Sequence, residues 1–149
     1  MITLTAEQLE RIQKHAESTY PDECCGAILG TFSPNTNGAV EEAADRTAAD
    51  ILPIDNRRND GEAYHRFLIT PKDFIFCEKE ARKQKLDLIG FYHSHPDHPS
   101  KPSQYDLERA FPVYSYVIVS VQNGKYDIIT SWIMQNDRSQ FIEEKIIQQ

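Results

Sequence analysis

Three of the five histidines of this 149-residue chain, His93, His95 and His98, fall within six consecutive residues, directly after an apolar run. In an extended chain alternate side chains point to the same side, so His93 and His95 would share one face of a strand. Two imidazoles that converge at the end of a strand make half of a zinc site. Asp106, in the first turn of the next predicted helix, could supply a carboxylate oxygen.

Three protein ligands with an open fourth position are typical of a catalytic zinc, whereas structural zinc sites are closed by a fourth protein ligand. Asp106 has a second interpretation, because Ser103-Gln-Tyr-Asp106 also matches the capping box that starts helices. An aspartate in a first turn could cap the helix or bind a metal, and the sequence leaves both open.

Other metal-site patterns fit less well. His93-Ser-His95-Pro-Asp97-His98 matches the His-x-His-x-Asp-His string of the metallo-β-lactamase fold, but no histidine follows His98 to complete that site. A cupin would need a glutamate soon after the paired histidines, and the first one is Glu108. We therefore expect Asp97 and His98 to lie at the rim of a substrate loop.

The segment from His93 to Asp106 resembles the JAMM signature of the MPN-plus metalloproteases, His-x-His-Pro-x6-Ser-x-x-Asp, with every fixed position present. That family also has a glutamate between its first helix and a strand, with a glycine shortly after it. Glu23-Cys-Cys-Gly26 stands at this position. The resemblance implies one Zn²⁺ per chain, bound by His93, His95 and Asp106 with a water as fourth ligand. It implies that Glu23 carries the proton, and that Ser103, as a buried hydroxyl, hydrogen-bonds the oxyanion or the substrate carbonyl.

The residues around Glu23 have simpler interpretations as well. Asp22-Glu23 after Pro21 could be a solvated turn, and only the position ahead of the Gly26 strand favours a catalytic glutamate. If a strand begins at Glu23, Cys25 shares its face and Cys24 points the other way. Both cysteines are expected to be small buried hydrophobes. A redox-sensitive thiol near the zinc is the other hypothesis.

The resemblance further implies hydrolysis of a peptide or isopeptide bond after the C-terminal Gly-Gly of a ubiquitin-like protein. This short, single-domain chain is similar to the stand-alone prokaryotic members of the family, which are associated with ubiquitin-like sulfur-carrier proteins. Their tail could bind as an added strand, and residues 33–62 could form a substrate-selecting lid. Two alternatives are a metal-free MPN-type scaffold, disfavoured because every ligand is retained, and a cell-wall peptide hydrolase, which would call for an export signal.

Helices are predicted from capping signals and apolar spacing. Two begin at the capping boxes Thr5-Ala-Glu-Gln8 and Thr70-Pro71-Lys-Asp73. The predicted helices span residues 6 to about 20, 70 to about 85, a short stretch from 103, and 139–149.

Strands are predicted over residues 24–32, 39–44, 66–69, 86–92, 113–121 and 125–134, the last two joined as a hairpin by Asn123-Gly124. A mobile loop is expected over 55–61. Interspersed strands and helices predict an α/β (α+β) fold, a mixed sheet flanked by helices in one domain over 1–149. The resemblance implies that this is an MPN/JAMM domain with cytidine-deaminase-like layering.

The composition excludes several classes of function. Sixteen Lys and Arg against 23 Asp and Glu give a net charge of −7, which disfavours nucleic-acid binding. No apolar run approaches the roughly 20 residues that span a bilayer, and we expect no signal peptide. Three cysteines are an odd number, so reduced thiols in the cytoplasm are expected. Nothing in the sequence indicates an oligomeric state.

Overall fold

The computed structural model describes residues 1–33, 44–56 and 69–149. In chain order its elements are β1 (Ile2–Leu4), α1 (Ala6–Thr19), β2 (Cys25–Ser33), β3 (Asp45–Ile54), α2 (Pro71–Lys83), β4 (Asp87–Pro96), α3 (Gln104–Arg109), β5 (Ser115–Gln122), β6 (Lys125–Met134), β7 (Phe141–Glu144) and β8 (Ile146–Gln148).

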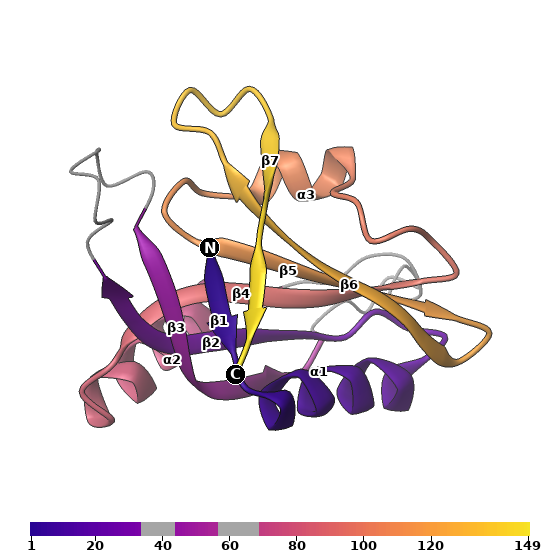
Figure 1. Ribbon diagram of the computed structural model, residues 1–149, viewed down its shortest axis with the longest axis horizontal. Coiled ribbons are helices and arrows are strands. Elements are labelled where there is room, and N and C mark those ends of the chain that lie inside the picture. Colours follow the sequence, from indigo (N-terminus) through magenta and orange to yellow (C-terminus); the bar gives the residue numbers. More distant parts are fainter. Residues whose placement is uncertain (34–43, 57–68) are drawn as a thin grey trace.

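The described strands form one mixed sheet in the order β7-β6-β5-β4-β2-β3-β1-β8. Strand β4 is central, parallel to β5 and antiparallel to β2. The two edge strands, β7 and β8, are separated along the chain by Lys145 alone. The sheet is therefore strongly curved, so that its two edge strands follow each other directly along the chain (Figure 1).

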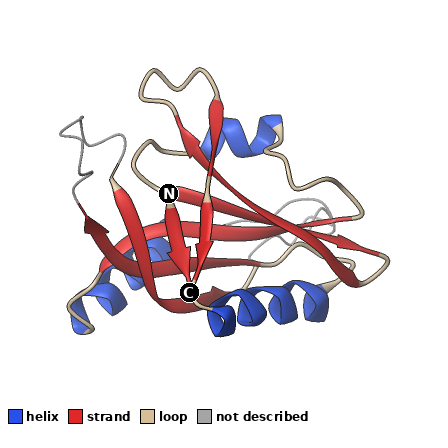
Figure 2. Ribbon diagram, in the orientation of Figure 1, coloured by secondary structure: helices blue, strands red, loops and turns tan. Residues whose placement is uncertain are grey.

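Helices cover both faces of the sheet (Figure 2). On one face α1 buries Leu9, Ile12 and Ala16 in a core that includes Tyr92 of β4. On the other face α2 buries Cys77 and Ala81 in a second core, to which the residues around α3 contribute. The predicted α+β class, with a mixed sheet flanked by helices, is confirmed. No helix in the described ranges is long and apolar enough to cross a membrane.

The capping boxes form as predicted. Thr5 Oγ1 accepts a hydrogen bond from Gln8 N, and Thr70 Oγ1 accepts one from Asp73 N. The side chains of Gln8 and Asp73, each at the third helical position, accept a hydrogen bond from the backbone N–H of the cap residue. These contacts satisfy backbone N–H groups that a helix start leaves unpaired. The hairpin at Asn123-Gly124 also forms, between β5 and β6.

The helix predicted over 139–149 is wrong, because this segment forms β7 and β8. Ile142 and Ile146 are four residues apart, as on a helix, but Ile142 pairs with Ile133 of β6 and Ile146 with Ile2 of β1. Each partner strand offers unpaired backbone N–H and C=O groups that a strand satisfies and a helix cannot.

Residues 33–62 are not one loop, because they contain the ten-residue strand β3. The buried side of β3 includes Arg46, whose guanidinium donates to the carbonyl oxygens of Val113 and Ala44 and lies 3.8 Å from Glu144. Because an arginine stands at one of the buried positions, the sequence of β3 lacks the alternation of apolar and polar residues that would predict a strand. Three predicted segments lie mostly outside the described residues: the strands over 39–44 and 66–69 and the loop over 55–61.

Candidate metal centre

Strand β4 presents His93 and His95 on the face of the sheet that α2 and α3 cover. His93 pairs with Cys25 of β2 on one side and with Ile118 of β5 on the other. The residues are 2% and 6% exposed. A strand that is paired on both sides and buried on both faces gives the two imidazoles a rigid base.

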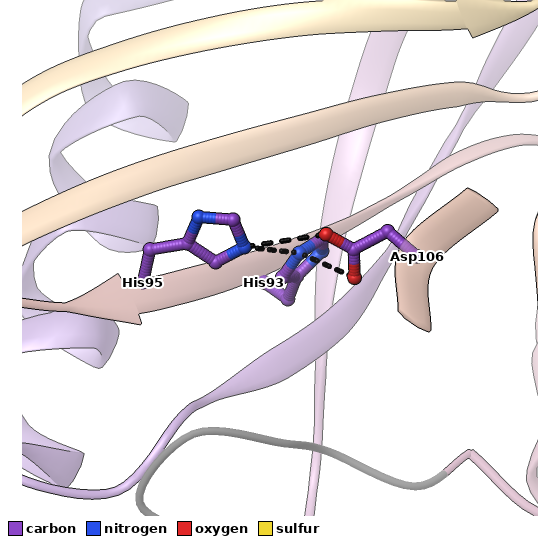
Figure 3. A group of neighbouring side chains, drawn as sticks. All are labelled: His93, His95 and Asp106. Atoms are coloured by element: carbon purple, nitrogen blue, oxygen red, sulfur yellow. Dashed lines mark hydrogen bonds and ion pairs between the residues drawn. The ribbon is translucent and has the colours of Figure 1, made fainter. Parts of the chain in front are cut away.

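Helix α3 brings Asp106 to these histidines through its capping box. Ser103 Oγ accepts a hydrogen bond from Asp106 N at 3.1 Å, and Ser103 N donates to Asp106 Oδ2 at 2.8 Å. The same buried carboxylate faces both imidazoles (Figure 3). The two interpretations of Asp106 therefore hold together: it caps its helix and lies where a metal ligand would.

The Nε2 atoms of the two histidines lie close together, and each lies at a similar distance from one of the two carboxylate oxygens of Asp106. His93 Nε2 lies 3.1 Å from His95 Nε2 and 3.2 Å from Asp106 Oδ1, and His95 Nε2 lies 3.3 Å from Asp106 Oδ2. Ligands bound at about 2.0–2.1 Å to a tetrahedral zinc ion are about 3.3 Å apart. In the described part of the chain these residues are the group that could hold a metal ion, and their spacing fits zinc.

His95 is oriented by a backbone contact. Its Nδ1 lies 2.7 Å from the carbonyl oxygen of Pro99, which can only accept a hydrogen bond. Nδ1 must therefore carry a proton. In the neutral imidazole the lone pair then lies on Nε2, where a metal ion could bind in place of the proton that Nε2 shares with Asp106.

The electrostatics suit a cation. Burial alone would raise the pKa of the Asp106 carboxyl, but the charge of His93 and hydrogen bonds from His93, His95 and Ser103 N hold this pKa well below its usual range. Burial lowers the pKa of His95, while its contacts to Asp106 and Pro99 and the charges of Asp106 and Glu23 raise it overall. Asp106 is therefore ionised at neutral pH, as a metal ligand must be.

Glu23 lies two residues before the first residue of β2 and is buried. Cys24 N donates to Ser94 Oγ at 2.8 Å, and Ser94 N to Cys24 O at 3.1 Å, so the pairing of β2 with β4 extends beyond Cys25. Continued by one more step, this register sets Glu23 level with His95. The backbone carbonyl of Glu23 accepts a hydrogen bond from Asn56 at 3.0 Å.

Ser103 differs from the expectation in one respect, since it is exposed rather than buried. Asp97 and His98 are also exposed, as expected of rim residues. The Asp97 carboxylate accepts hydrogen bonds from the Tyr20 hydroxyl at 2.6 Å and from Asn123 N at 2.8 Å, so it holds the loop rather than facing the centre. The ligand set of the metallo-β-lactamase pattern is therefore not assembled.

The cysteines fit the simpler interpretation. All three are free and buried, and Cys24 and Cys25 belong to the cores on opposite faces of the sheet. Burial raises the pKa of Cys24 and of Cys77 to about 11. Thiols that stay protonated at neutral pH are unreactive, which argues against a redox-sensitive residue here.

The curled mixed sheet, with paired histidines on its central strand and an aspartate on the next helix, defines a JAB/MPN-type domain with a candidate metal centre. The chain belongs to the family described as prokaryotic homologs of the JAB domain, whose model matches residues 5–135. The family expected from the JAMM-like motif is thereby confirmed.

Two curated relatives carry the name desampylase. The chain is 28% identical over 124 residues to the one from Haloferax volcanii, with 80% of each chain covered. It is 29% identical over 99 residues to the one from Pyrococcus furiosus, covering 65% of this chain and 66% of the relative.

Solved structures show the same fold. A protein from Salinibacter ruber is 39% identical with a TM-score of 0.72, covering 100% of this chain and 92% of its own. One from Desulfitobacterium hafniense is 30% identical with a TM-score of 0.81, covering 100% and 93%. A JAB1/MPN domain protein from Archaeoglobus fulgidus, 17% identical with a TM-score of 0.51 and covering 98% and 97%, supports the fold alone.

Proposed function

We propose that this protein is a zinc-dependent hydrolase that cleaves a peptide or isopeptide bond after the C-terminal Gly-Gly of a ubiquitin-like or sulfur-carrier protein. The main support is the buried group of His93, His95 and Asp106, whose donor atoms lie 3.1 to 3.3 Å apart. The ubiquitin-like substrate is what the JAMM-like motif implies, and the two relatives named desampylase support a hydrolase of this family.

In this proposal the two histidines and Asp106 bind one zinc ion. When bound, zinc supplies a water whose pKa is lowered to about 7. The Glu23 carboxylate accepts a proton from the attacking water and returns it to the nitrogen of the leaving amine. A C–O bond forms as the C–N bond breaks, so the carrier leaves with a free C-terminal carboxylate. The Ser103 hydroxyl, whose oxygen accepts a hydrogen bond from Asp106 N, would donate a hydrogen bond to the substrate carbonyl oxygen.

The substrate tail cannot join the sheet beside β4, because β2 and β5 already occupy both sides of this strand. Binding as an added strand stays a prediction for an edge of the sheet and not for β4 itself. A lid made of all residues from 33 to 62 is dropped, because β3 is built into the sheet.

The alternative of a metal-free scaffold has less support, because such a protein has no need of a buried carboxylate aimed at two imidazoles. No observation favours a cell-wall peptide as substrate. The three reduced and buried cysteines support a cytoplasmic location.

Hydrolysis and zinc content of Glu23→Gln test the proposal. The substrate is a ubiquitin-like protein whose C-terminal glycine is joined to a lysine side chain of a second protein. We expect the unaltered protein to cleave this bond and a chelator to stop it. Glu23→Gln should keep about one zinc per chain and lose hydrolysis, while Glu143→Gln, at an exposed glutamate of β7, should keep both. Undiminished hydrolysis by Glu23→Gln would contradict the mechanism.

A further inference from the structure

A cavity of about 650 Å³ opens beside the metal centre. His93 and Asp106 form part of its wall, so it begins at the reacting atoms of the proposed mechanism. Most of its other described lining is apolar, from Ile69, Phe74, Ile75, Phe91, Phe111 and Tyr116.

The cavity has a fixed aromatic floor. Phe91 stacks against Tyr116 with ring centroids 6.1 Å apart, and Phe74 packs beside Phe91 at the same distance. The Tyr116 hydroxyl accepts a hydrogen bond from Phe111 N at 2.8 Å, and burial raises the pKa of Tyr116 to about 12. The floor is therefore uncharged at neutral pH and held in place, which favours a ligand that brings apolar surface.

The cavity mouth combines exposed apolar and charged side chains. Phe111 is 56% exposed there, and Ile75 is similarly exposed. The Arg109 guanidinium lies 3.6 Å from the centre of the Tyr105 ring, and Glu108 stands beside it with an opposite charge. Among the described residues the lining has no concentration of positive charge for a phosphate or a nucleotide, and it leaves large apolar side chains that a ligand would cover.

We propose that this cavity is a specificity subsite that binds a bulky apolar side chain of the substrate polypeptide. This inference rests on the proposed function. Two glycines carry no side chain, so a hydrolase that cuts after Gly-Gly must select its substrate through neighbouring residues. The cavity adjoins the candidate metal ligands and is large enough for an aromatic or branched aliphatic side chain. Burying such a side chain there removes apolar surface from water, which stabilises the complex.

Binding of a small probe tests the subsite without turnover. The probe is N-acetyl-phenylalanine methylamide, with N-acetyl-aspartate methylamide for comparison, added to the zinc-loaded full chain. We expect the phenylalanine probe to shift the methyl NMR signals of Ile69, Ile75 and Ala110 and to leave that of Ile142 on β7 unchanged. The aspartate probe should shift none of them at the same concentration.

Two matched variants locate the binding. Phe111→Ser should weaken the phenylalanine probe about tenfold, whereas Phe76→Ser should not, since Phe76 is 50% exposed on α2 outside the lining. On the Gly-Gly substrate, Phe111→Ser should raise KM and keep kcat. Equal probe binding by the two variants, or no shift of the three methyl signals, would overturn the subsite.

The two proposals fail separately in this design. A protein that hydrolyses the Gly-Gly bond but binds neither probe contradicts the subsite alone. A protein that binds the phenylalanine probe among these methyl groups but hydrolyses nothing contradicts the hydrolase and leaves an apolar binding site.

Discussion

The Nδ1 atom of His95 lies 2.7 Å from the carbonyl oxygen of Pro99, and this contact decides which imidazole nitrogen faces Asp106. The next carbonyl along the loop, that of Ser100, accepts hydrogen bonds from the Thr130 hydroxyl and the Trp132 indole. Strand β6 thereby holds the loop that orients a histidine of β4. The geometry of the candidate metal centre therefore depends on residues that are not among its candidate ligands.

Removing the Thr130 hydroxyl should weaken zinc binding. Thr130→Val keeps the shape of the side chain but loses the hydrogen bond to Ser100 O, so the Pro99 carbonyl is held less firmly. We expect zinc affinity to fall about tenfold, as for other outer contacts of metal ligands, measured by competition with a chromophoric chelator. Thr130→Ser restores the donor and should bind zinc normally. Equal affinities of the valine variant and the unaltered protein would refute this role of β6.

Ser103 is predicted to do more than cap its helix. Ser103→Ala and Thr5→Ala each remove the side chain of a capping box, and each should lower the free energy of unfolding by about 1 kcal/mol in urea titrations. Only Ser103→Ala should also reduce kcat on the Gly-Gly substrate, because Thr5 lies at the start of α1, away from the centre. If both variants kept full kcat, Ser103 would be a cap only.

Gly26 is predicted to be required for packing. A Cβ atom at this position would overlap the ring of Tyr92, which is fully buried and whose hydroxyl lies 2.8 Å from His15 Nδ1. Gly26→Ala should lower the free energy of unfolding by about 1–3 kcal/mol. The same change in a Tyr92→Ala background should cost much less, since the clash is gone. An equal cost in both backgrounds would show that the ring is not the cause.

The grouping of His93, His95 and Asp106 could be predicted from the sequence because these residues come from one strand and the helix that follows it. The starts of α1 and α2 could be predicted for the same reason, since each capping box consists of two residues three positions apart in the sequence. Strands β7 and β8 could not be predicted from local sequence, because they form by pairing with β6 and β1, which lie near opposite ends of the sheet. The contact of the Pro99 carbonyl with His95 could not be predicted, because every residue type has a backbone carbonyl. The cavity could not be predicted either, because its lining side chains come from α2, β4, α3 and β5, which are separate elements along the sequence.

The proposed mechanism depends most directly on which residues bind the zinc ion. X-ray absorption at the zinc edge, on protein loaded with zinc, reports the donor atoms and their distances. We predict about one zinc per chain, with two imidazole nitrogens and oxygen donors at about 2.0–2.1 Å. A sulfur donor at about 2.3 Å would contradict the assignment. It would point to Cys25, which pairs with His93 across β2 and β4, as a ligand. Protein that binds no zinc would contradict it as well.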